Sequence, residues 1–182
     1  MTTSQLARPH SPLKAPPARL RNYYLYRERD TRDVPWVRPS DVKALTLTRP
    51  VVLVNGAFDL LHSSHMRLIF AARQKAGTLI CALDADAKIQ KEKGAARPIQ
   101  SFIERAATLN YMPIDYIVEI GNRRDMDILI RDLKPDLRVR NEAEKGNVSR
   151  YPDIRKMYVR QGRMHTSYIL NRILKRYATK KT

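Results

Sequence analysis

The sequence predicts an α/β protein built on a doubly wound parallel sheet of four to five strands, with helices on both faces. From residue 51 onward, short apolar runs alternate with stretches that have helical periodicity or helix-capping signals. The runs are continuously apolar, which is typical of strands buried on both faces, and parallel strands need helical crossovers between them. The length of 182 residues suits one domain of ordinary size with an extended basic arm.

Four strands are predicted from the apolar runs, each followed by a glycine or a polar residue. The first is rich in β-branched residues and ends at Gly56, and the second contains Cys81. The four runs are Val51–Asn55, Thr78–Leu83, Asp115–Ile120 and Leu137–Arg140. Because Cys81 is the single cysteine and lies in an apolar run, we expect a buried, inert thiol. A single cysteine also excludes an internal disulfide framework and a cysteine-based zinc site.

Helices are predicted from apolar periodicity and from start and stop signals. Met66, Ile69 and Phe70 fall on one side of a helix that follows the first strand. Ser101 and Glu104 have the spacing of a capping box at the start of another helix. The predicted helices are Pro39–Leu47, Ser64–Lys75, Ser101–Tyr111, Met126–Leu133, Pro152–Arg160 and Ser167–Tyr177.

The remaining segments are predicted to lie outside regular structure. Lys88–Ala96 is polar and basic, and we expect a flexible loop there. Residues 1–49 are expected to form a basic arm and lead-in, because clustered prolines favour extended chain. They precede a domain at residues 50–177, which is followed by a basic tail at residues 178–182.

The lengths of the apolar runs limit where the protein can be located. None approaches the roughly 20 residues of a membrane span, which excludes a transmembrane protein. Residues 1–22 contain no apolar stretch for a secretory signal. The absence of acidic residues there fits a transit peptide, whereas the prolines fit an arm that lies on a partner. We therefore expect a cytoplasmic or mitochondrial matrix protein that is not secreted.

The formal net charge of +17 is distributed unevenly. Residues 1–50 hold 10 basic and 4 acidic residues, residues 51–120 hold 8 and 7, and residues 121–182 hold 17 and 7. The middle of the chain is thus nearly neutral, and its flanks are expected to be drawn to polyanions such as RNA. A solvated basic surface that only aids solubility is the alternative reading.

Two histidines lie where the first strand passes into its helix. His62 and His65 are three residues apart at this turn. In open α/β sheets, ligands bind at the carboxyl ends of the strands, and a helix N-terminus there suits a phosphate. Both rings would stabilise the extra charge of a phosphoryl group in its transition state. The alternative is a pair of surface histidines without a role in chemistry.

The chain around these histidines resembles the cytidylyltransferase-like nucleotidyltransferases, whose fold is Rossmann-like. Gly56–His62 resembles their G-x-F-D-x-x-H motif, and His62–His65 resembles HxGH. Four further segments match motifs of the family. Asp84–Asp86 resembles D-D or T-D, and Lys93–Ile99, followed by Glu104 and Arg105, resembles K-G-x-x-R-P-I…E/D-R. Lys134–Val139 resembles K-P-D-x-x-V, and His165–Ser167, followed by Arg172 and Ile173, resembles S-T-T…R-I. The pattern is most similar to the sugar-phosphate adenylyltransferase of ADP-heptose synthesis and to glycerol-3-phosphate cytidylyltransferase.

The resemblance implies roles for particular residues. The catalytic set would be His62, His65 and Arg105, all acting on the triphosphate. The nucleotide-binding set would be Gly56, Ala57, Phe58, Lys88, Lys91, Thr166 and Ser167. Mg²⁺ would arrive with the nucleoside triphosphate, and the protein itself would hold no metal. The alternatives are a surface salt bridge of Arg105 with Glu104 or a neighbour, and simple helix capping by Thr166 and Ser167.

Three departures from the family pattern concern the edge of this site. Ser64 replaces the glycine of HxGH, so a side chain would intrude where nucleotide approaches the backbone. Arg140–Glu144 replaces a glycine-rich acceptor element. Tyr158–Met164 leaves little room for the family's last strand, so the sheet is expected to have lost that strand or to keep a stub.

Two functions are consistent with these patterns. The first is a nucleotidyltransferase that transfers a nucleoside monophosphate from CTP or ATP to a phosphorylated sugar or polyol, with release of pyrophosphate. The second is a catalytically degenerate domain that serves as an RNA-bound component of a ribonucleoprotein, such as a mitochondrial ribosome. The motifs favour the first, and the basic flanks favour the second.

Overall fold

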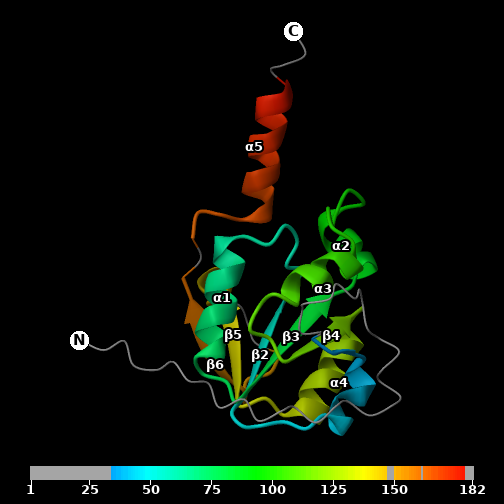
Figure 1. Ribbon diagram of the computed structural model, residues 1–182, viewed down its shortest axis with the longest axis vertical. Coiled ribbons are helices and arrows are strands. Elements are labelled where there is room, and N and C mark those ends of the chain that lie inside the picture. Colours follow the sequence, from blue (N-terminus) through cyan, green and yellow to red (C-terminus); the bar gives the residue numbers. More distant parts are fainter. Residues whose placement is uncertain (1–33, 147–149, 161, 179–182) are drawn as a thin grey trace, which may run out of the picture.

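A computed structural model describes residues 34–146, 150–160 and 162–178 of the chain (Figure 1). Its centre is a sheet of six parallel strands in the order β1-β4-β3-β2-β5-β6. The four predicted strands are all present, with ends shifted by one residue at most. They are β2 (Val51–Gly56), β3 (Thr78–Asp84), β4 (Tyr116–Ile120) and β5 (Leu137–Asn141). The predicted doubly wound α/β fold is confirmed, and Cys81 is fully buried in β3 as expected.

The two outer strands were not among those predicted. β1 (Trp36–Val37) pairs with β4, and β6 (Arg155–Val159) pairs with β5. The helix predicted at Pro152–Arg160 is therefore wrong, and the last strand of the sheet is retained. None of the residues of β6 is buried, so an edge strand here tolerates Arg155 and Lys156 instead of a continuous apolar run.

Helices connect and cover these strands. The α-helices are α1 (Ser63–Arg73), α2 (Asp86–Lys93), α3 (Phe102–Leu109), α4 (Arg123–Leu133) and α5 (Thr166–Ala178), and the 3-10 helices are η2 (Pro39–Ala44) and η3 (Glu142–Glu144). The capping box at α3 is confirmed, since Ser101 and Glu104 each bond to the backbone N–H of the other. The flexible loop predicted at Lys88–Ala96 is wrong, because most of it belongs to α2. Ile89 is the buried anchor of that helix, and Lys88 forms ion pairs with residues four positions away on either side.

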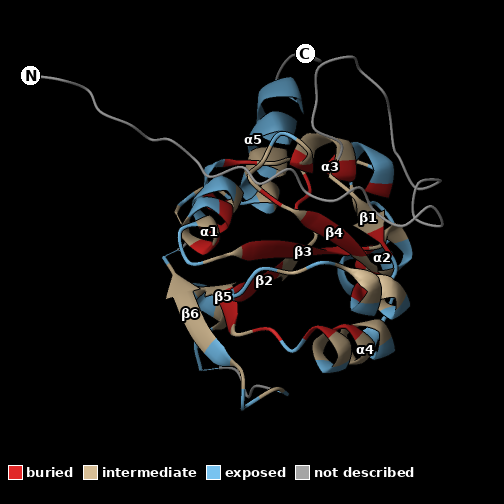
Figure 2. Cartoon of the chain, turned by 60° about the horizontal axis from the view of Figure 1, so that its bottom comes forward, coloured by how far each residue is buried: buried red, intermediate tan, exposed pale blue. Residues whose placement is uncertain are grey.

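The sheet separates two apolar layers (Figure 2). On one face, α1 and α3 pack against alternate residues of the strands, and on the other face η2 and α4 do so. Val37 and Val42 are buried in the second layer, so the ordered domain begins before residue 50. On α1 the buried apolar residues are Leu68, Ile69 and Ala72, whereas the predicted Met66 and Phe70 are exposed. No described helix is long and apolar enough to cross a membrane.

The order of the strands reverses beside β2. The chain passes from β2 to β3 and β4 in one direction along the sheet, and then returns to β5 on the other side of β2. In open α/β sheets, ligands bind at such a reversal, outside the carboxyl ends of the two diverging strands. These ends are Gly56 in β2 and Asn141 in β5.

Candidate functional site

The loop that follows β2 has an unusual backbone. Phe58 and Leu60 have φ angles of 48° and 49°, in the left-handed region that residues with a side chain seldom adopt. The Phe58 ring is nevertheless almost fully buried in the layer beneath α1 and α3. Such conformations persist where the surroundings determine them, and they concentrate at functional sites.

Asp59 determines the conformation of this loop. It is 1% exposed, and Arg97 donates two hydrogen bonds to Oδ2 at 3.0 and 2.7 Å. The backbone N–H groups of Ile99 and Gln100 also donate to its carboxylate. Burial raises the pKa of Asp59, but these bonds outweigh that effect and hold the pKa below its usual value. Asp59 thus joins the loop to the segment that precedes α3.

His62 and His65 lie together at the start of α1. His62 is the N-cap residue and His65 lies in the first turn, and their rings stack with centroids 3.8 Å apart and planes inclined by 22°. His65 also meets the ring of Phe58, at 5.2 Å between centroids. The Nδ1 atoms of both histidines are buried and have no hydrogen-bond partner. The predicted proximity of the two rings is present in the structure.

Both imidazoles are neutral at neutral pH. Burial, with a smaller contribution from the neighbouring His62 and Lys93, lowers the pKa of His65 to about 3. Burial also lowers the pKa of His62, together with the nearby His165. A neutral imidazole carries one N–H donor and one acceptor nitrogen, so this pair would offer hydrogen bonds rather than positive charge to a phosphate.

Arg105 does not occupy the position expected of a phosphate ligand. It is 0% exposed, and its guanidinium bonds to protein acceptors through Nε, Nη1 and Nη2. The acceptors are the carbonyl oxygens of Gln100, Ala57 and Asp84 and the carboxylate of Asp86. The surface salt bridge with Glu104 is absent too, since the ion pair is with Asp86 at 2.7 Å. Arg105 therefore holds the ends of β2 and β3 together from inside the domain.

The other predicted nucleotide ligands lie around the same edge. Gly56 and Ala57 end β2 and begin its loop. Lys88 is paired with Asp84 at 3.0 Å and Glu92 at 2.9 Å, whereas Lys91 is exposed on α2. Of these two lysines, Lys91 is the better placed to meet a ligand from solvent.

The start of α5 is tied to the site by Thr166. Its hydroxyl donates to the carbonyl oxygen of Asp59 at 2.9 Å, while Ser167 is exposed. The helix is capped by His165, whose Nδ1 accepts from the Tyr168 N–H at 3.1 Å. The capping alternative for Thr166 and Ser167 is therefore wrong, and His165, one residue earlier, has that role.

Ser64 uses its hydroxyl to bind the chain just before α5. The side chain is 4% exposed and donates to the carbonyl oxygen of Met164 at 2.7 Å. A Cβ atom added at Gly162 would come within 3.3 Å of the Ser64 hydroxyl, so the approach of the two segments is close. The serine that replaces the motif glycine thus forms a tether between α1 and the segment that leads to α5.

Sequence reasoning missed three members of this arrangement. Asp59 and Arg97 stand inside quoted motifs, and for Asp59 a position three residues before His62 was a further available signal. His165 also stands inside a quoted motif, but its role as the cap depends on where α5 begins. Among the described residues, no group of three His, Cys, Asp or Glu side chains is arranged to hold a metal ion.

The strand order reverses beside β2, and the N-terminus of α1 with the stacked histidines lies at the carboxyl end of that strand. This is the arrangement in which α/β domains of the mononucleotide-binding class place their ligands. Residues 53–175 match the cytidylyltransferase-like family, and the chain belongs to that family. Similar curated proteins include the bifunctional protein HldE of Campylobacter curvus, of Campylobacter concisus and of Wolinella succinogenes. They are 37%, 36% and 34% identical over 99 residues, which are 54% of this chain and 21% of each relative.

The shared segment is thus about a fifth of the length of these curated relatives. Among solved structures, the lipopolysaccharide core biosynthesis protein from Thermoplasma volcanium is 21% identical. That likeness covers 63% of this chain and 98% of the other, with a TM-score of 0.47.

Proposed function

We propose that this domain transfers a nucleotidyl group from ATP or CTP to a phosphorylated sugar or polyol and releases pyrophosphate. The observation that carries the proposal is the stacked pair of His62 and His65, with buried and unpartnered Nδ1 atoms, at the N-terminus of α1. Membership of the cytidylyltransferase-like family supports it, and so do the motifs shared with a sugar-phosphate adenylyltransferase.

The reaction needs no nucleophile from the protein. A phosphate oxygen of the acceptor attacks the α-phosphorus of the triphosphate, a new P–O bond forms, and the bond to the bridging oxygen breaks. Pyrophosphate leaves with that electron pair, accompanied by the Mg²⁺ that entered with the nucleotide as part of the substrate. The task of the chain is to align the two phosphates and to stabilise the charge that develops between them.

Some of the described residues would contact the triphosphate, and others position the loop that follows β2. His62 and His65 would donate N–H groups to the triphosphate, and the exposed Lys91 would add charge. Arg105 and Asp59 act through the backbone, because they fix the loop that carries Phe58. Burying both positioning residues keeps the loop rigid, as alignment of the two reacting phosphates requires.

A pyrophosphate-release assay tests the proposal. Full-length protein is incubated with MgATP or MgCTP and a panel of sugar and polyol phosphates, and nucleotide binding is measured separately by calorimetry. His62→Asn and His65→Asn are expected to lower kcat/KM by about 100-fold or more, as removal of a transition-state donor does elsewhere. His10→Asn, outside the described residues, is the matched histidine control and should leave the rate unchanged.

Two results would overturn the proposal. One is the absence of pyrophosphate release from every combination, together with no binding of either triphosphate. The other is full activity in both histidine variants, since the chemistry would then take place without the pair.

A further inference from the structure

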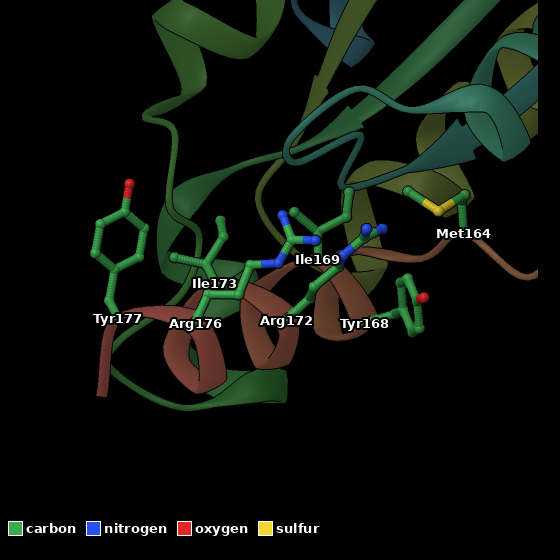
Figure 3. Close-up of a pocket in the computed structure, with 7 residues that line it drawn as sticks. All are labelled: Met164, Tyr168, Ile169, Arg172, Ile173, Arg176 and Tyr177. Atoms are coloured by element: carbon green, nitrogen blue, oxygen red, sulfur yellow. The ribbon is translucent and has the colours of Figure 1, made fainter. Parts of the chain in front are cut away.

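A groove runs along α5, at a distance from the histidine pair in sequence and on a separate helix. Its cavity volume is about 580 Å³. Two neighbouring rows of side chains spaced four residues apart line it, and they point to the same side of the helix (Figure 3). One row is Tyr168, Arg172 and Arg176, and the other is Ile169, Ile173 and Tyr177.

The helix that carries this groove projects from the rest of the domain. It rises away from the layered core in Figure 1, and none of its 13 residues is buried. Leu174 and Tyr177 are 66% and 68% exposed. Helices of about this length are marginal in water without tertiary packing, so a surface of this kind gains stability when a partner covers it.

The charge of α5 and of the chain around it indicates which kind of partner this helix binds. The charged residues of α5 are Arg172, Lys175 and Arg176, and the chain from residue 154 to residue 182 holds nine basic residues and no acidic one. A second copy of the same helix would bring like charges together, which disfavours self-association through this face. The occupant must therefore be anionic.

The side chains of the groove indicate which class of anionic partner fits it. Tyr168 and Tyr177 stand nine positions apart in sequence, about 13 Å along a helix axis, and Arg172 and Arg176 lie between them. Proteins that bind single-stranded nucleic acid combine aromatic rings, on which bases stack, with cations that neutralise the phosphates. We propose that this groove binds single-stranded nucleic acid, with bases against the tyrosines and phosphates at the two arginines.

The proposal is independent of the transferase activity and is tested by fluorescence anisotropy. Labelled oligouridylate and oligothymidylate of about 12 nucleotides, a length within known site sizes, are titrated with the full chain over a range of salt concentrations. The affinity is expected to fall steeply with salt. Arg172→Ala with Arg176→Ala should reduce the salt slope by about 1.4, since each phosphate contact on a single strand adds about 0.7. Comparison of the two oligonucleotides shows whether RNA or DNA is preferred.

Two further variants test whether binding depends on the side chains of this groove or only on the positive charge of the protein. Tyr168→Ala with Tyr177→Ala should weaken binding about tenfold or more while leaving the salt slope unchanged, because stacking releases no counterions. Arg123→Ala with Arg124→Ala removes the same charge from the exposed start of α4 and should have little effect. Circular dichroism checks that each variant remains folded.

Several outcomes would overturn the inference. Equal losses in the α4 and α5 arginine variants would show that only net charge matters. Duplex binding as tight as single-strand binding would remove the role of stacking. Binding to anionic lipid vesicles without binding to either oligonucleotide would assign the helix a membrane surface instead.

Discussion

The histidine pair shows how burial, rather than charge, defines a residue in this site. Burial and the neighbouring His62 lower the pKa of His65 to about 3, against 6.5 for an unperturbed imidazole. The unfolded chain therefore binds a proton at His65 between these two pH values, and the folded chain does not. Stability should accordingly fall as the pH is lowered from about 6.5 toward 3.

Replacing His65 with Asn tests this sign. Between pH 7 and pH 5, urea unfolding should show the wild type losing about 1–2 kcal/mol more than His65→Asn, because the variant lacks the titrating group. The carboxylates titrate in both proteins, so the difference isolates His65. A constant gap between the two proteins across this range would mean that His65 takes up its proton over the same pH range in the folded and unfolded chains.

Replacement of the single residue Arg105 should lower the stability of the protein by a large amount. Arg105→Met removes a buried cation that satisfies three carbonyl oxygens and the carboxylate of Asp86, so we expect a loss of about 3–5 kcal/mol in the free energy of unfolding. Asp86→Asn keeps the three carbonyl bonds and should lose much less. Urea denaturation of both variants measures the difference, and equal losses would show that the ion pair, not the carbonyl bonds, stabilises the strand ends.

At the scale of elements, α5 depends on two hydrogen bonds near its first turn. Ser64→Ala removes the bond to the Met164 carbonyl, and Thr166→Val removes the bond to the Asp59 carbonyl. Each change should lower stability by about 1 kcal/mol, and amide exchange in α5 should quicken while exchange in β2 and β3 stays slow. Ser167→Ala is the matched control, because that hydroxyl is exposed. Unchanged exchange in α5 would show that other contacts fix the helix.

Predictability also differs from element to element. The inner strands β2 to β5 are continuous apolar runs because both faces are covered, and that pattern is visible in one sequence. α2 carries mainly polar side chains and β6 begins with Arg155 and Lys156, so neither offered a continuous apolar run. The motif histidines could be placed because they adjoin a strand end. The bonds of Arg105 could not, because three of its four partners lie 19 to 48 residues away in the sequence, and only the fold brings them together.

At the scale of the whole molecule, the net charge of +17 must oppose folding through self-repulsion. The ten ion pairs among the described residues include several with a half-exposed or more exposed partner, such as Arg131 with Asp132, and pairs of that kind contribute little. Because the repulsion between like charges outweighs the weak surface ion pairs, screening by salt should stabilise this protein. A protein held together by surface ion pairs would instead be destabilised by salt.

Thermal unfolding at increasing NaCl tests this balance. Between about 0.02 and 0.2 M, where the screening length shortens most, Tm should rise by several degrees. Arg172→Glu with Arg176→Glu lowers the net charge by four without touching the core, so its Tm should start higher at low salt and rise less. A Tm that falls with salt would show that attractive pairs outweigh the repulsion. Because residues 51–120 are nearly neutral, the excess positive charge lies in the two flanks of the chain, and screening of that charge is the reason why added salt should raise the Tm.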